Sequence, residues 1–522
     1  MYDRTQNQSG PLVSVIIPTF NRAHTLGAAL GSALRQTHSN IEVLVVRDGG
    51  EEVESVVHSF DDSRVVFIDR DVNRGKAFSL NEALERAGGR YIAYLDDDDI
   101  WYPNHVEVLV NCLESRPDCR LAYSDLYRTY CRVQPDGRRV VLSKVLEVSR
   151  DFDRFVMLYF NHTLHVSLMH DAALLDRTGL YNENLDVLID WDFTRRACFY
   201  TDFCHVHDIT GEYYSPVDRA DRLSVIHRRC PEDYLRHVLQ IRTARPPKPW
   251  PKMGDVSIIL DAAGLDAATK QTLLSIWRHT FYPYKLYLPL CDGEAGGLNI
   301  EMPNVVIVPV QAKEPAATRI NRSLAVCEGD YVAVVPAGFP VADLWLEDSL
   351  YALVELQADC GALILEGSTE RCWACVAGTQ LLRGVRENHP NLSVRDSLAA
   401  AGMPARRVQA EEIPFQLDQS LAQARLARDR QNWRQAADIL EYAAGRYDNS
   451  LWLRSLAAED RFKAGDYGRC AELCGHVNAK RPTVETLLLE ARLRRTNENT
   501  DGAIALLRRA TQILEGTESA WT

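Results

Sequence analysis

Short apolar runs alternate with amphipathic segments over the first 95 residues of the chain. Runs rich in β-branched and aromatic residues predict strands at Val13–Ile17, Ile41–Val46, Val65–Ile68 and Tyr91–Leu95. Leucine and alanine at helical spacing predict a helix over Thr25–Gln36, between the first two strands. Strands that alternate with helices in this way are typical of an α/β domain with a mostly parallel sheet.

The fourth predicted strand ends in four consecutive carboxylates, Asp96 to Asp99. Adjacent negative charges repel one another, so a fold keeps them together chiefly when a cation lies between them. A calcium loop of the EF-hand type is excluded, because Trp101 stands where that loop needs glycine and Ile100 where it needs an oxygen ligand. A solvated acidic loop is the plain alternative, but such a loop needs no buried strand before it.

Polar residues follow the other predicted strands as well. In sheets of this class, ligands bind beyond the carboxyl ends of the strands. Aspartate can accept hydrogen bonds from a base, while arginine and lysine suit phosphates and glycine lets the backbone approach a ligand. For any one of these segments alone, an ordinary polar turn is the better explanation. The candidate nucleotide-binding residues at these ends are Pro18, Thr19, Asn21, Arg22, Asp48, Asn73, Gly75, Lys76, Asp96 and Asp97.

Four segments, taken in order and spacing, resemble the family 2 glycosyltransferases of the GT-A fold. They are VSVIIPTFNR (13–22), VVRDG (45–49), NRGK (73–76) and LDDDDIW (95–101). The resemblance covers about residues 11–215. It implies a nucleotide-sugar donor, a divalent metal and inversion at the anomeric carbon. A UDP-sugar is the expected donor, and a glycan or a protein is the expected acceptor.

The resemblance also assigns roles to residues within these segments. Thr19 and Asp48 would contact the nucleoside, and Asp96 to Asp98 would form the Asp-x-Asp region, in which Asp96 and Asp98 bind Mn²⁺ or Mg²⁺. Carboxylate oxygens are hard ligands suited to either ion. The sequence departs from the family at Arg47, where relatives often carry a second acid.

A later motif, IDWDF at residues 189–193, supplies the expected catalytic base. An inverting transfer needs a carboxylate that takes the proton of the attacking hydroxyl, and the resemblance assigns this role to Asp190. Asp192 is the alternative, although a negative charge near a helix N-terminus explains it as well. Ile189 stands where the family tends to carry another acid, which leaves the positioning of the acceptor open.

Two histidines, His205 and His207, lie on a short apolar segment further along the chain. His207 is a candidate additional ligand of the metal, because imidazole is a common metal ligand. Alternating histidines on a strand are more often structural, so both interpretations stay open. Upstream, strands are predicted at Leu121–Ser124 and Leu164–Met169, and residues 125–160 give no clear pattern.

The chain changes character after the first domain, which is expected over residues 1–240. Four prolines fall within residues 241–253 and predict a stiff linker. Beyond it the sequence repeats itself, because Val256–Ile259 echoes Val13–Ile16. Such self-similarity predicts a second GT-A-like domain.

The second copy lacks the residues expected to carry chemistry. Pro336-Ala337-Gly338 stands in place of Asp96 to Asp98, so no side-chain oxygen is left there for a metal. Leu260-Asp261 replaces Pro18-Thr19, while Asp292 is kept in its turn. Residues 254–413 are therefore interpreted as a pseudo-transferase domain that packs on the first domain or holds an acceptor.

Residues 414–522 are rich in alanine, leucine, arginine and glutamate at helical spacing. A motif that begins at Trp433 recurs 34 residues later at Tyr467, and more weakly at Thr500. This pattern resembles tetratricopeptide repeats, which have two helices each. Such an array usually offers a surface to a protein partner, and self-association is an equal alternative.

Composition narrows the classes of function. The 522 residues carry 59 basic and 72 acidic side chains, a formal charge of −13, which argues against a nucleic-acid or anionic-membrane binder. No apolar run is long enough for a transmembrane segment, and the first ten residues lack the order of a signal peptide, so a cytoplasmic location is expected. Thirteen scattered cysteines fit buried free thiols better than disulfides, and this includes Cys372 and Cys375.

The expected fold class is α/β, with two GT-A folds in tandem, the second degenerate, and an all-α C-terminal repeat domain. The expected function is metal-dependent, inverting transfer of a sugar from a nucleotide-sugar to a hydroxyl. The alternative is a non-catalytic scaffold that keeps a relic nucleotide-sugar pocket and recruits a partner through its repeats. A nucleotidyltransferase would need a glycine-rich loop after the first strand, and residues 18–22 contain no glycine.

Overall fold

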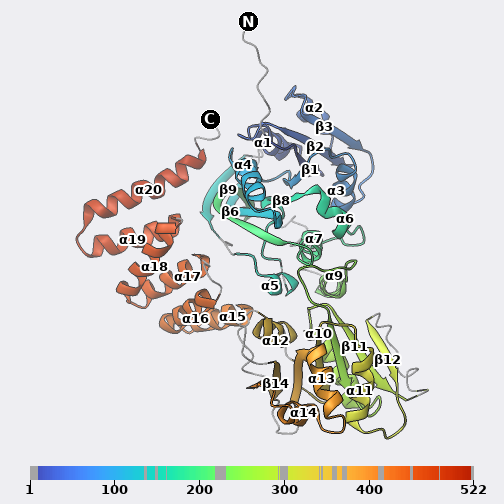
Figure 1. Cartoon of the computed structure of the whole chain (residues 1–522). Helices are drawn as coiled ribbons and strands as arrows, with labels where there is room; N and C mark the ends of the chain where they lie inside the picture. Colours follow the sequence, from blue (N-terminus) through green and yellow to red (C-terminus); the bar gives the residue numbers. More distant parts are fainter. Residues whose placement is uncertain are drawn as a thin grey trace. The chain divides into compact units, whose positions relative to one another are not determined.

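The computed structural model divides the chain into two compact units (Figure 1). Unit 1 comprises residues 1–241 and 417–522, and unit 2 comprises residues 242–416. The structure describes residues 10–134, 138–146, 151–159, 161–217, 231–291, 293, 304–339, 341, 345–354, 361–366, 373–409, 417–446, 451–480 and 482–518.

The described part of unit 1 contains a nine-stranded sheet of order β3-β2-β1-β4-β8-β6-β9-β5, with β7 paired to β6. Strands β1, β2, β3 and β4 are mutually parallel where they pair. Strand β8 runs antiparallel to both β4 and β6, so β6 and its parallel neighbour β9 point the same way as β1. The carboxyl ends of β1, β2, β3, β4, β6 and β9 therefore meet at one edge. The strands are β1 (Val13–Thr19), β2 (Ile41–Asp48), β3 (Val65–Arg70), β4 (Tyr91–Tyr94), β5 (Ile100–Trp101), β6 (Cys119–Val133), β7 (Arg139–Val145), β8 (Leu168–Asp171) and β9 (Asp202–Pro216).

Two helices, α1 (Ala23–Leu34) and α4 (His105–Ser115), pack on one face of this sheet. Their leucine, valine and alanine side chains form one core with alternate residues of β1 and β2. Full burial of a side chain such as valine or leucine contributes about 1.5–3 kcal/mol, so this core holds the strand ends in register. The predicted elements of the first 95 residues are confirmed within two residues at most ends. The remaining helices of this part are α2 (Glu54–His58), α3 (Lys76–Leu84), α5 (Arg154–Tyr159), α6 (Leu175–Thr178), α7 (Ile189–Ala197) and α9 (Pro231–Thr243).

Two predicted strands differ from the structure. The short strand expected at Leu121–Ser124 is the start of the fifteen-residue β6, which continues into the segment that gave no pattern. The first half of Leu164–Met169 is a 3₁₀ turn rather than a strand. The cause is local, because the backbone N–H and the hydroxyl of Ser167 both donate to the carbonyl of Leu164, at 2.9 and 2.8 Å.

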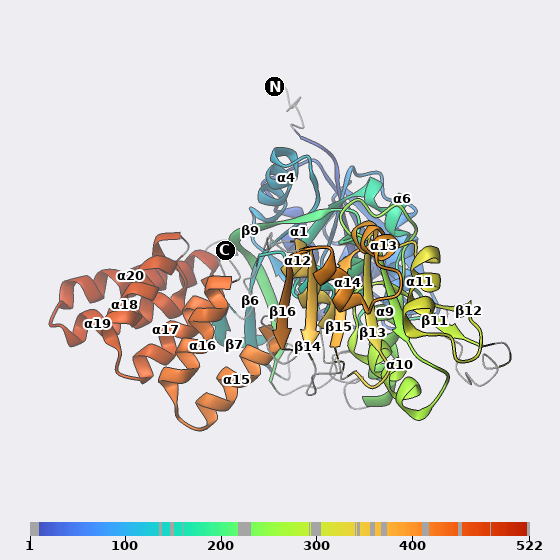
Figure 2. The same cartoon turned by 60° about the horizontal axis from the view of Figure 1, so that its bottom comes forward.

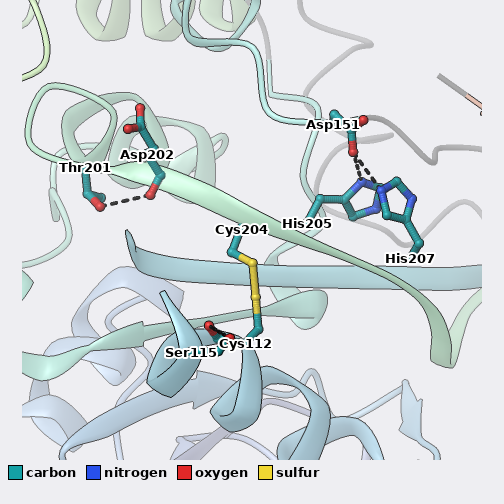
Figure 3. Close-up of a disulfide and its surroundings, with 8 residues drawn as sticks. All are labelled: Cys112, Ser115, Asp151, Thr201, Asp202, Cys204, His205 and His207. Atoms are coloured by element: carbon teal, nitrogen blue, oxygen red, sulfur yellow. Dashed lines mark hydrogen bonds and ion pairs between the residues drawn. A yellow bond between two sulfur atoms is a disulfide. The ribbon is translucent and has the colours of Figure 1, made fainter. Parts of the chain in front are cut away.

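A disulfide joins Cys112 of α4 to Cys204 of β9 across 92 residues of sequence (Figure 3). This pairing corrects the expectation that the cysteines are free thiols, since the two come together only when α4 packs on the sheet. Cys375 is a buried free thiol, while Cys372 lies outside the described residues. Disulfides are rare in the cytosol, so this pairing removes one basis for the expected cytoplasmic location.

Unit 2 contains, in its described part, a seven-stranded sheet of order β12-β11-β10-β13-β15-β14-β16 (Figure 2). Four parallel strands are followed by β15, which is antiparallel to both of its neighbours, and then by the parallel pair β14 and β16. This sequence of directions is the one found from β3 to β9 in unit 1. The elements are β10 (Val256–Asp261), β11 (Tyr284–Leu290), β12 (Val305–Pro309), β13 (Tyr331–Pro336), β14 (Ala362–Glu366), β15 (Trp373–Gly378), β16 (Ala405–Gln409), α10 (Ala267–His279), α11 (Ala316–Val326), α12 (Trp345–Val354), α13 (Thr379–Asn388) and α14 (Val394–Ala400).

The two sheets share a buried contact between a glycine and a serine. The N–H of Gly89 donates to the hydroxyl of Ser14 at 2.9 Å, and the N–H of Gly329 donates to that of Ser257 at 3.0 Å. A Cβ on either glycine would lie 2.5–2.6 Å from the backbone nitrogen of that serine, so both positions require glycine.

The pairing register also corrects one detail of the predicted repeat. Val13 pairs with Tyr91 in unit 1 and Val256 pairs with Tyr331 in unit 2. Asp261 is five residues after Val256, and Pro18 is five residues after Val13, so Asp261 corresponds to Pro18. The expected match was to Thr19, one position later. Asp292 lies outside the described residues.

Six consecutive helices follow in the C-terminal part of unit 1, each packed against the next (Figure 1). They are α15 (Leu417–Asp429), α16 (Trp433–Arg446), α17 (Leu451–Lys463), α18 (Tyr467–Lys480), α19 (Val484–Thr496) and α20 (Thr500–Glu518). The three recurring motif positions, Trp433, Tyr467 and Thr500, open every second helix. Across the part of the chain that the structure describes, every helix is too short or too polar to cross a bilayer.

Candidate active site

An acidic cluster lies just beyond the end of β4, at the shared edge of the unit 1 sheet. It consists of Asp96, Asp98 and Asp99, whose carboxylate oxygens all lie within 4.8 Å of one another. The N–H of Asp99 donates to the carbonyl of Asp96 at 3.1 Å, which closes the turn that gathers the three side chains. Asp99 also accepts from the N–H of Tyr214 in β9 at 2.8 Å, so it is anchored to the sheet.

Two cations compensate the charge of these aspartates. Arg22, at the start of α1, lies 2.5 Å from Asp98 and 3.1 Å from Asp97. Lys76, the first residue of α3, lies 2.5 Å from Asp96. Both cations come from segments that the sequence placed at strand ends, and the structure brings them to the same edge.

The burial of these groups shifts their protonation. Burial raises the pKa of Asp97 to about 7, although the charge of Arg22 opposes the rise. For Asp96 burial acts in the same direction, but the ammonium of Lys76 outweighs it and holds the pKa of Asp96 below its ordinary value. Burial disfavours the charge on Lys76, yet Asp96 and Asp190 together raise the pKa of Lys76 above its ordinary value.

Asp48, at the end of β2, organises the loop before α3. Its two oxygens accept from the N–H groups of Arg74 and Gly75 at 2.8 and 2.9 Å, and from the guanidinium of Arg70 at 2.5 Å. Gly75 has φ of 93°, a conformation that favours glycine, and Asn73 accepts from its N–H at 3.1 Å. The carboxylate of Asp48, which is predicted to contact the nucleoside, thus also holds the Asn73–Lys76 loop in place.

The turn after β1 contacts the turn after β2. Thr19 is 2% exposed, and Pro18 lies at intermediate depth beside it. Asn21 adopts a φ of 54° and accepts from the N–H of Glu51 at 2.8 Å. A Cβ on Gly50 would lie 2.2 Å from this Asn21 oxygen, so the turn after β2 must pass close to the turn after β1. Arg47, at the family's departure point, pairs instead with Asp69 of β3.

Asp190 lies in the first turn of α7, and the structure brings it near the acidic cluster. Its carboxylate accepts from the side chain of Asn161 at 2.9 Å. Burial raises the pKa of Asp190, while the positive charge of Lys76 opposes the rise. The preceding Leu188 has φ of 62°, which turns the chain sharply into the helix. Asp190 and Asp96 thus act on the same ammonium group.

The alternative base, Asp192, is directed elsewhere. Its carboxylate accepts from Arg196, one turn along α7, at 2.7 and 3.0 Å, and both side chains are mostly buried. This ion pair accounts for the presence of Asp192 in the helix.

The structure does not bring His207 to the acidic cluster. It lies with Asp125 and His205 in a separate group, because β8 and β6 stand between β4 and the β9 strand that carries both histidines. Among the described residues, the group at the acidic cluster that could hold a metal therefore consists of Asp96, Asp98 and Asp99, without His207.

The residues present fit a hard divalent cation. Three carboxylates within 4.8 Å offer the oxygen donors that Mg²⁺ and Mn²⁺ prefer. Asp96 and Asp98 are the partly exposed members, and Asp99 is buried beneath them. Asp99 is an addition to the pair expected from the sequence.

Residues 14–161 match the family described as Glycosyl transferase family 2. They form a glycosyltransferase family 2 domain. An uncharacterized glycosyltransferase of Rickettsia prowazekii is 32% identical over 216 residues, which cover 38% of this chain and 63% of that protein. The UDP-Glc:alpha-D-GlcNAc-diphosphoundecaprenol beta-1,3-glucosyltransferase WfgD of Escherichia coli is 40% identical over 103 residues, 20% of this chain and 41% of WfgD. The chain thus spans less than two thirds of the length of these relatives.

Among solved structures, the chain is similar to TarS 1-349 of S. aureus in complex with UDP-GlcNAc, at 20% identity and a TM-score of 0.34. That match covers 44% of this chain and 70% of the TarS chain. The mannosyltransferase PcManGT of Pyrobaculum calidifontis, in complex with GDP-Man and Mn²⁺, is similar at 19% identity and a TM-score of 0.33, covering 47% of this chain and 69% of the other.

One residue of the family 2 domain site could not be found by reading the sequence. Asn161 holds Asp190 in place, but it lies next to the segment of residues 125–160 that has neither strand nor helix periodicity. The position of this segment is fixed by His165, which opens the 3₁₀ turn and stacks on Tyr94 of β4 at 4.4 Å between ring centroids. This stack places the 161–165 segment beside β4 and the aspartates that follow it.

Proposed function

We propose that the family 2 domain transfers a sugar from a nucleotide-sugar to an acceptor hydroxyl, with a divalent metal and with inversion at the anomeric carbon. One observation carries the proposal: the acidic cluster, the Lys76–Asp96 pair and Asp190 are gathered at one edge of the sheet. A donor diphosphate needs cations, and a transfer needs a base within reach of the acceptor. Both requirements are met by residues at this edge.

The donor side of the proposed site is formed by the ends of β1, β2 and β4. Mn²⁺ or Mg²⁺ held by Asp96 and Asp98 would neutralise the charge that develops on the departing diphosphate. Arg22 and Lys76 carry the positive charges nearest to these carboxylates and are placed to meet phosphate oxygens. Thr19 and Asp48 would bind the nucleoside, with Pro18, Asn21, Asn73 and Gly75 shaping the loops around it.

On the acceptor side, Asp190 would act as the general base. Its raised pKa gives it more basic character than a solvated aspartate, which suits removal of a proton from a hydroxyl as the oxygen attacks. Asn161 orients the carboxylate through one oxygen and leaves the other for the acceptor. The positive charge of Lys76 stabilises the ionised form of Asp190, which is the form that can accept the proton.

A UDP-sugar is the proposed donor, and a glycan or protein hydroxyl is the proposed acceptor. The name of the related E. coli protein WfgD supports the donor class, since it describes a transferase that uses UDP-Glc. The same name describes a lipid-diphosphate-linked sugar as the acceptor of that protein. A glycan acceptor is accordingly the first to test.

We propose that residues 254–413 form a degenerate copy of the GT-A fold without transferase chemistry. Where the acidic cluster stands in unit 1, this sheet has Pro336-Ala337-Gly338, which offers a metal no side-chain oxygen. At the neighbouring strand end, Asp261 is paired with Arg319 at 2.7 Å, so its charge is satisfied within the unit. We propose further that helices α15 to α20 form tetratricopeptide-like repeats that bind a protein partner.

The test is donor turnover by the full-length protein. We expect UDP release from one member of a UDP-sugar panel in the presence of Mn²⁺ or Mg²⁺, and loss of that release with chelator. Asp98→Asn should abolish it, whereas Asp261→Asn, at the corresponding edge of unit 2, should leave it unchanged. Equal loss in both variants, with both proteins folded, would contradict the assignment of chemistry to the first sheet.

The alternative function is a scaffold that keeps a relic pocket and recruits a partner through the repeats. The gathered Asp190, Lys76 and acidic cluster favour the enzyme over the scaffold. Calorimetry distinguishes the two, because a scaffold would bind no nucleotide-sugar at millimolar Mn²⁺, while the enzyme would bind its donor with a measurable heat.

A further inference from the structure

A second group of metal-ligating side chains lies on the neighbouring strands β6 and β9. It consists of Asp125 of β6, His205 and His207 of β9, and Asp151, which precedes α5; these four are called the histidine cluster below. Figure 3 shows Asp151, His205 and His207 of this cluster. Ligand atoms of Asp125, His205 and His207 all lie within 4.8 Å of one another. One oxygen of Asp151 lies 2.9 Å from Nδ1 of His205 and 2.9 Å from Nε2 of His207.

The histidine cluster is separate from the acidic cluster. Leu121 of β6 pairs with His170 of β8, which in turn pairs with Ile92 of β4. Counting four residues along both strands places Asp125 level with Asp96, two strands away. At the usual strand spacing this is about 10 Å, too far for one ion to bind both groups.

The inner half of the histidine cluster is rigid. The side chains of His205 and Asp125 are 3% and 2% exposed, and the ring of His205 stacks on Tyr123 with centroids 4.7 Å apart. Nε2 of His205 lies 3.0 Å from Asp125, which leaves Nδ1 directed at Asp151. A carboxylate on one ring nitrogen fixes the tautomer and makes the other nitrogen the better ligand, as in many zinc sites.

The outer half is open to solvent. His207 and Asp151 have side chains that are 39% and 35% exposed, so an ion can reach the point where they meet His205. The disulfide partner Cys204 precedes His205 and fixes the start of this segment to α4 (Figure 3). A rigid inner pair with an accessible outer pair is the arrangement expected of a site that is built before its metal arrives.

We propose that the histidine cluster binds a divalent transition metal, Zn²⁺ by the chemistry of its donors. His205 Nδ1, His207 Nε2 and an oxygen of Asp151 are the ligands, and Asp125 orients His205. Two imidazole nitrogens and one carboxylate suit Zn²⁺ and differ from the all-oxygen set of the acidic cluster, which suits Mg²⁺ or Mn²⁺. The bound ion would tie the segment before α5 to β9. The proposal is independent of the glycosyltransferase assignment.

The test measures metal content of the full-length protein. The protein is stripped with chelator, dialysed against limiting Zn²⁺ in millimolar Mg²⁺, which occupies all-oxygen sites, and analysed by elemental mass spectrometry. We expect one bound Zn²⁺ per chain, and Co²⁺ in its place should give the visible absorption of a low-coordinate nitrogen and oxygen site.

Three variants decide where the ion binds. His207→Ala, at a half-exposed position that should not disturb folding, should lower Zn²⁺ affinity at least 100-fold. Asp125→Asn should lower it 10–100-fold through the orientation of His205. Asp98→Asn is the matched control in the acidic cluster and should retain Zn²⁺ fully. Retention of Zn²⁺ by folded His207→Ala, or its loss from Asp98→Asn, would overturn the proposal, as would wild-type protein that binds none.

Discussion

Replacement of Asp190 by asparagine is the sharpest test of the proposed chemistry. The substitution keeps the size of the side chain and an oxygen that can accept from Asn161, the contact seen at 2.9 Å. What it removes is the ability to take a proton. Lys76 stays charged, because its pairing with Asp96 at 2.5 Å is untouched.

The expected magnitude follows from this separation of roles. A positioned general base contributes about 10²- to 10⁴-fold to rate, which is about 3–5 kcal/mol of transition-state stabilisation. Asp190→Asn should therefore lower kcat by about that factor. The KM for the donor should stay within about threefold, since the donor-binding strand ends lie on β1, β2 and β4 rather than on α7.

The assay compares two variants from the same helix. Initial rates of UDP release are measured at saturating donor and Mn²⁺, and UDP affinity is measured by calorimetry. Asp192→Asn is the control, because its carboxylate is engaged by Arg196 at 2.7 Å. This variant should lose about 1–3 kcal/mol of stability through the weakened buried pair but keep its kcat.

Two results would refute the reasoning. The first is an Asp190→Asn protein with more than a tenth of the wild-type kcat, which would leave no room for a base at this position. The second is an Asp192→Asn protein that is folded and binds UDP but has lost activity more than 100-fold, which would transfer the role to Asp192.

Three further predictions concern other parts of unit 1. Reduction of the Cys112–Cys204 disulfide should lower the free energy of unfolding by about 4 kcal/mol, because the disulfide closes a loop of 92 residues. Denaturant unfolding with and without dithiothreitol measures this loss. A Cys112→Ser variant whose stability still falls with the reductant would contradict the prediction. Burial lowers the pKa of His105 to about 3 from 6.5, so the stability contributed by its neutral form is fully present above pH 6.5 and is lost as the pH falls toward 3. In urea titrations, His105→Gln should therefore reduce the fall in the free energy of unfolding over this pH range. An unchanged fall would show that other groups cause it. Lys76→Met removes a charge that lowers the pKa of Asp190, so the acid limb of the kcat profile should move to higher pH; a shift to lower pH would show that Lys76 acts otherwise.

The strands and the candidate donor edge could be predicted from the sequence because each depends on local pattern. A buried β-branched run such as Val13–Ile17 identifies a strand by itself, and in a parallel sheet the polar residues after such runs meet at one edge. That reasoning predicts that Arg22, Lys76 and Asp96 lie at the same edge, and in the structure Arg22 pairs with Asp98 while Lys76 pairs with Asp96. The same reasoning applies wherever residues lie close together because they follow neighbouring parallel strands.

Contacts set by side-chain geometry across distant segments could not be predicted. His207 was expected at the acidic cluster, but strand order puts two strands between β4 and β9, and no local pattern encodes that order. The Cys112–Cys204 pair depends in the same way on the packing of α4. For Asp48, the sequence correctly predicts a position at a strand end. Its hydrogen bond to the N–H of Gly75 could not be predicted, because it depends on how the loop before α3 folds back.

A hydrogen bond from a glycine N–H to a serine hydroxyl occurs in each sheet, and it predicts which substitutions the fold tolerates. Substitution of Gly89 or Gly329 should cost stability because no Cβ fits at either glycine, and substitution of Ser14 or Ser257 should cost stability because it removes the hydroxyl that accepts from the buried glycine N–H. Carboxylates at a site of chemistry are not required by the fold in this way, so the degenerate copy proposed for unit 2 could lose them without losing its sheet. A mutational scan can measure both the abundance and the turnover of each variant. The two measurements should therefore fall together at the glycine and serine positions of both sheets. They should differ only at the carboxylates of the first sheet, where turnover is lost but abundance is kept.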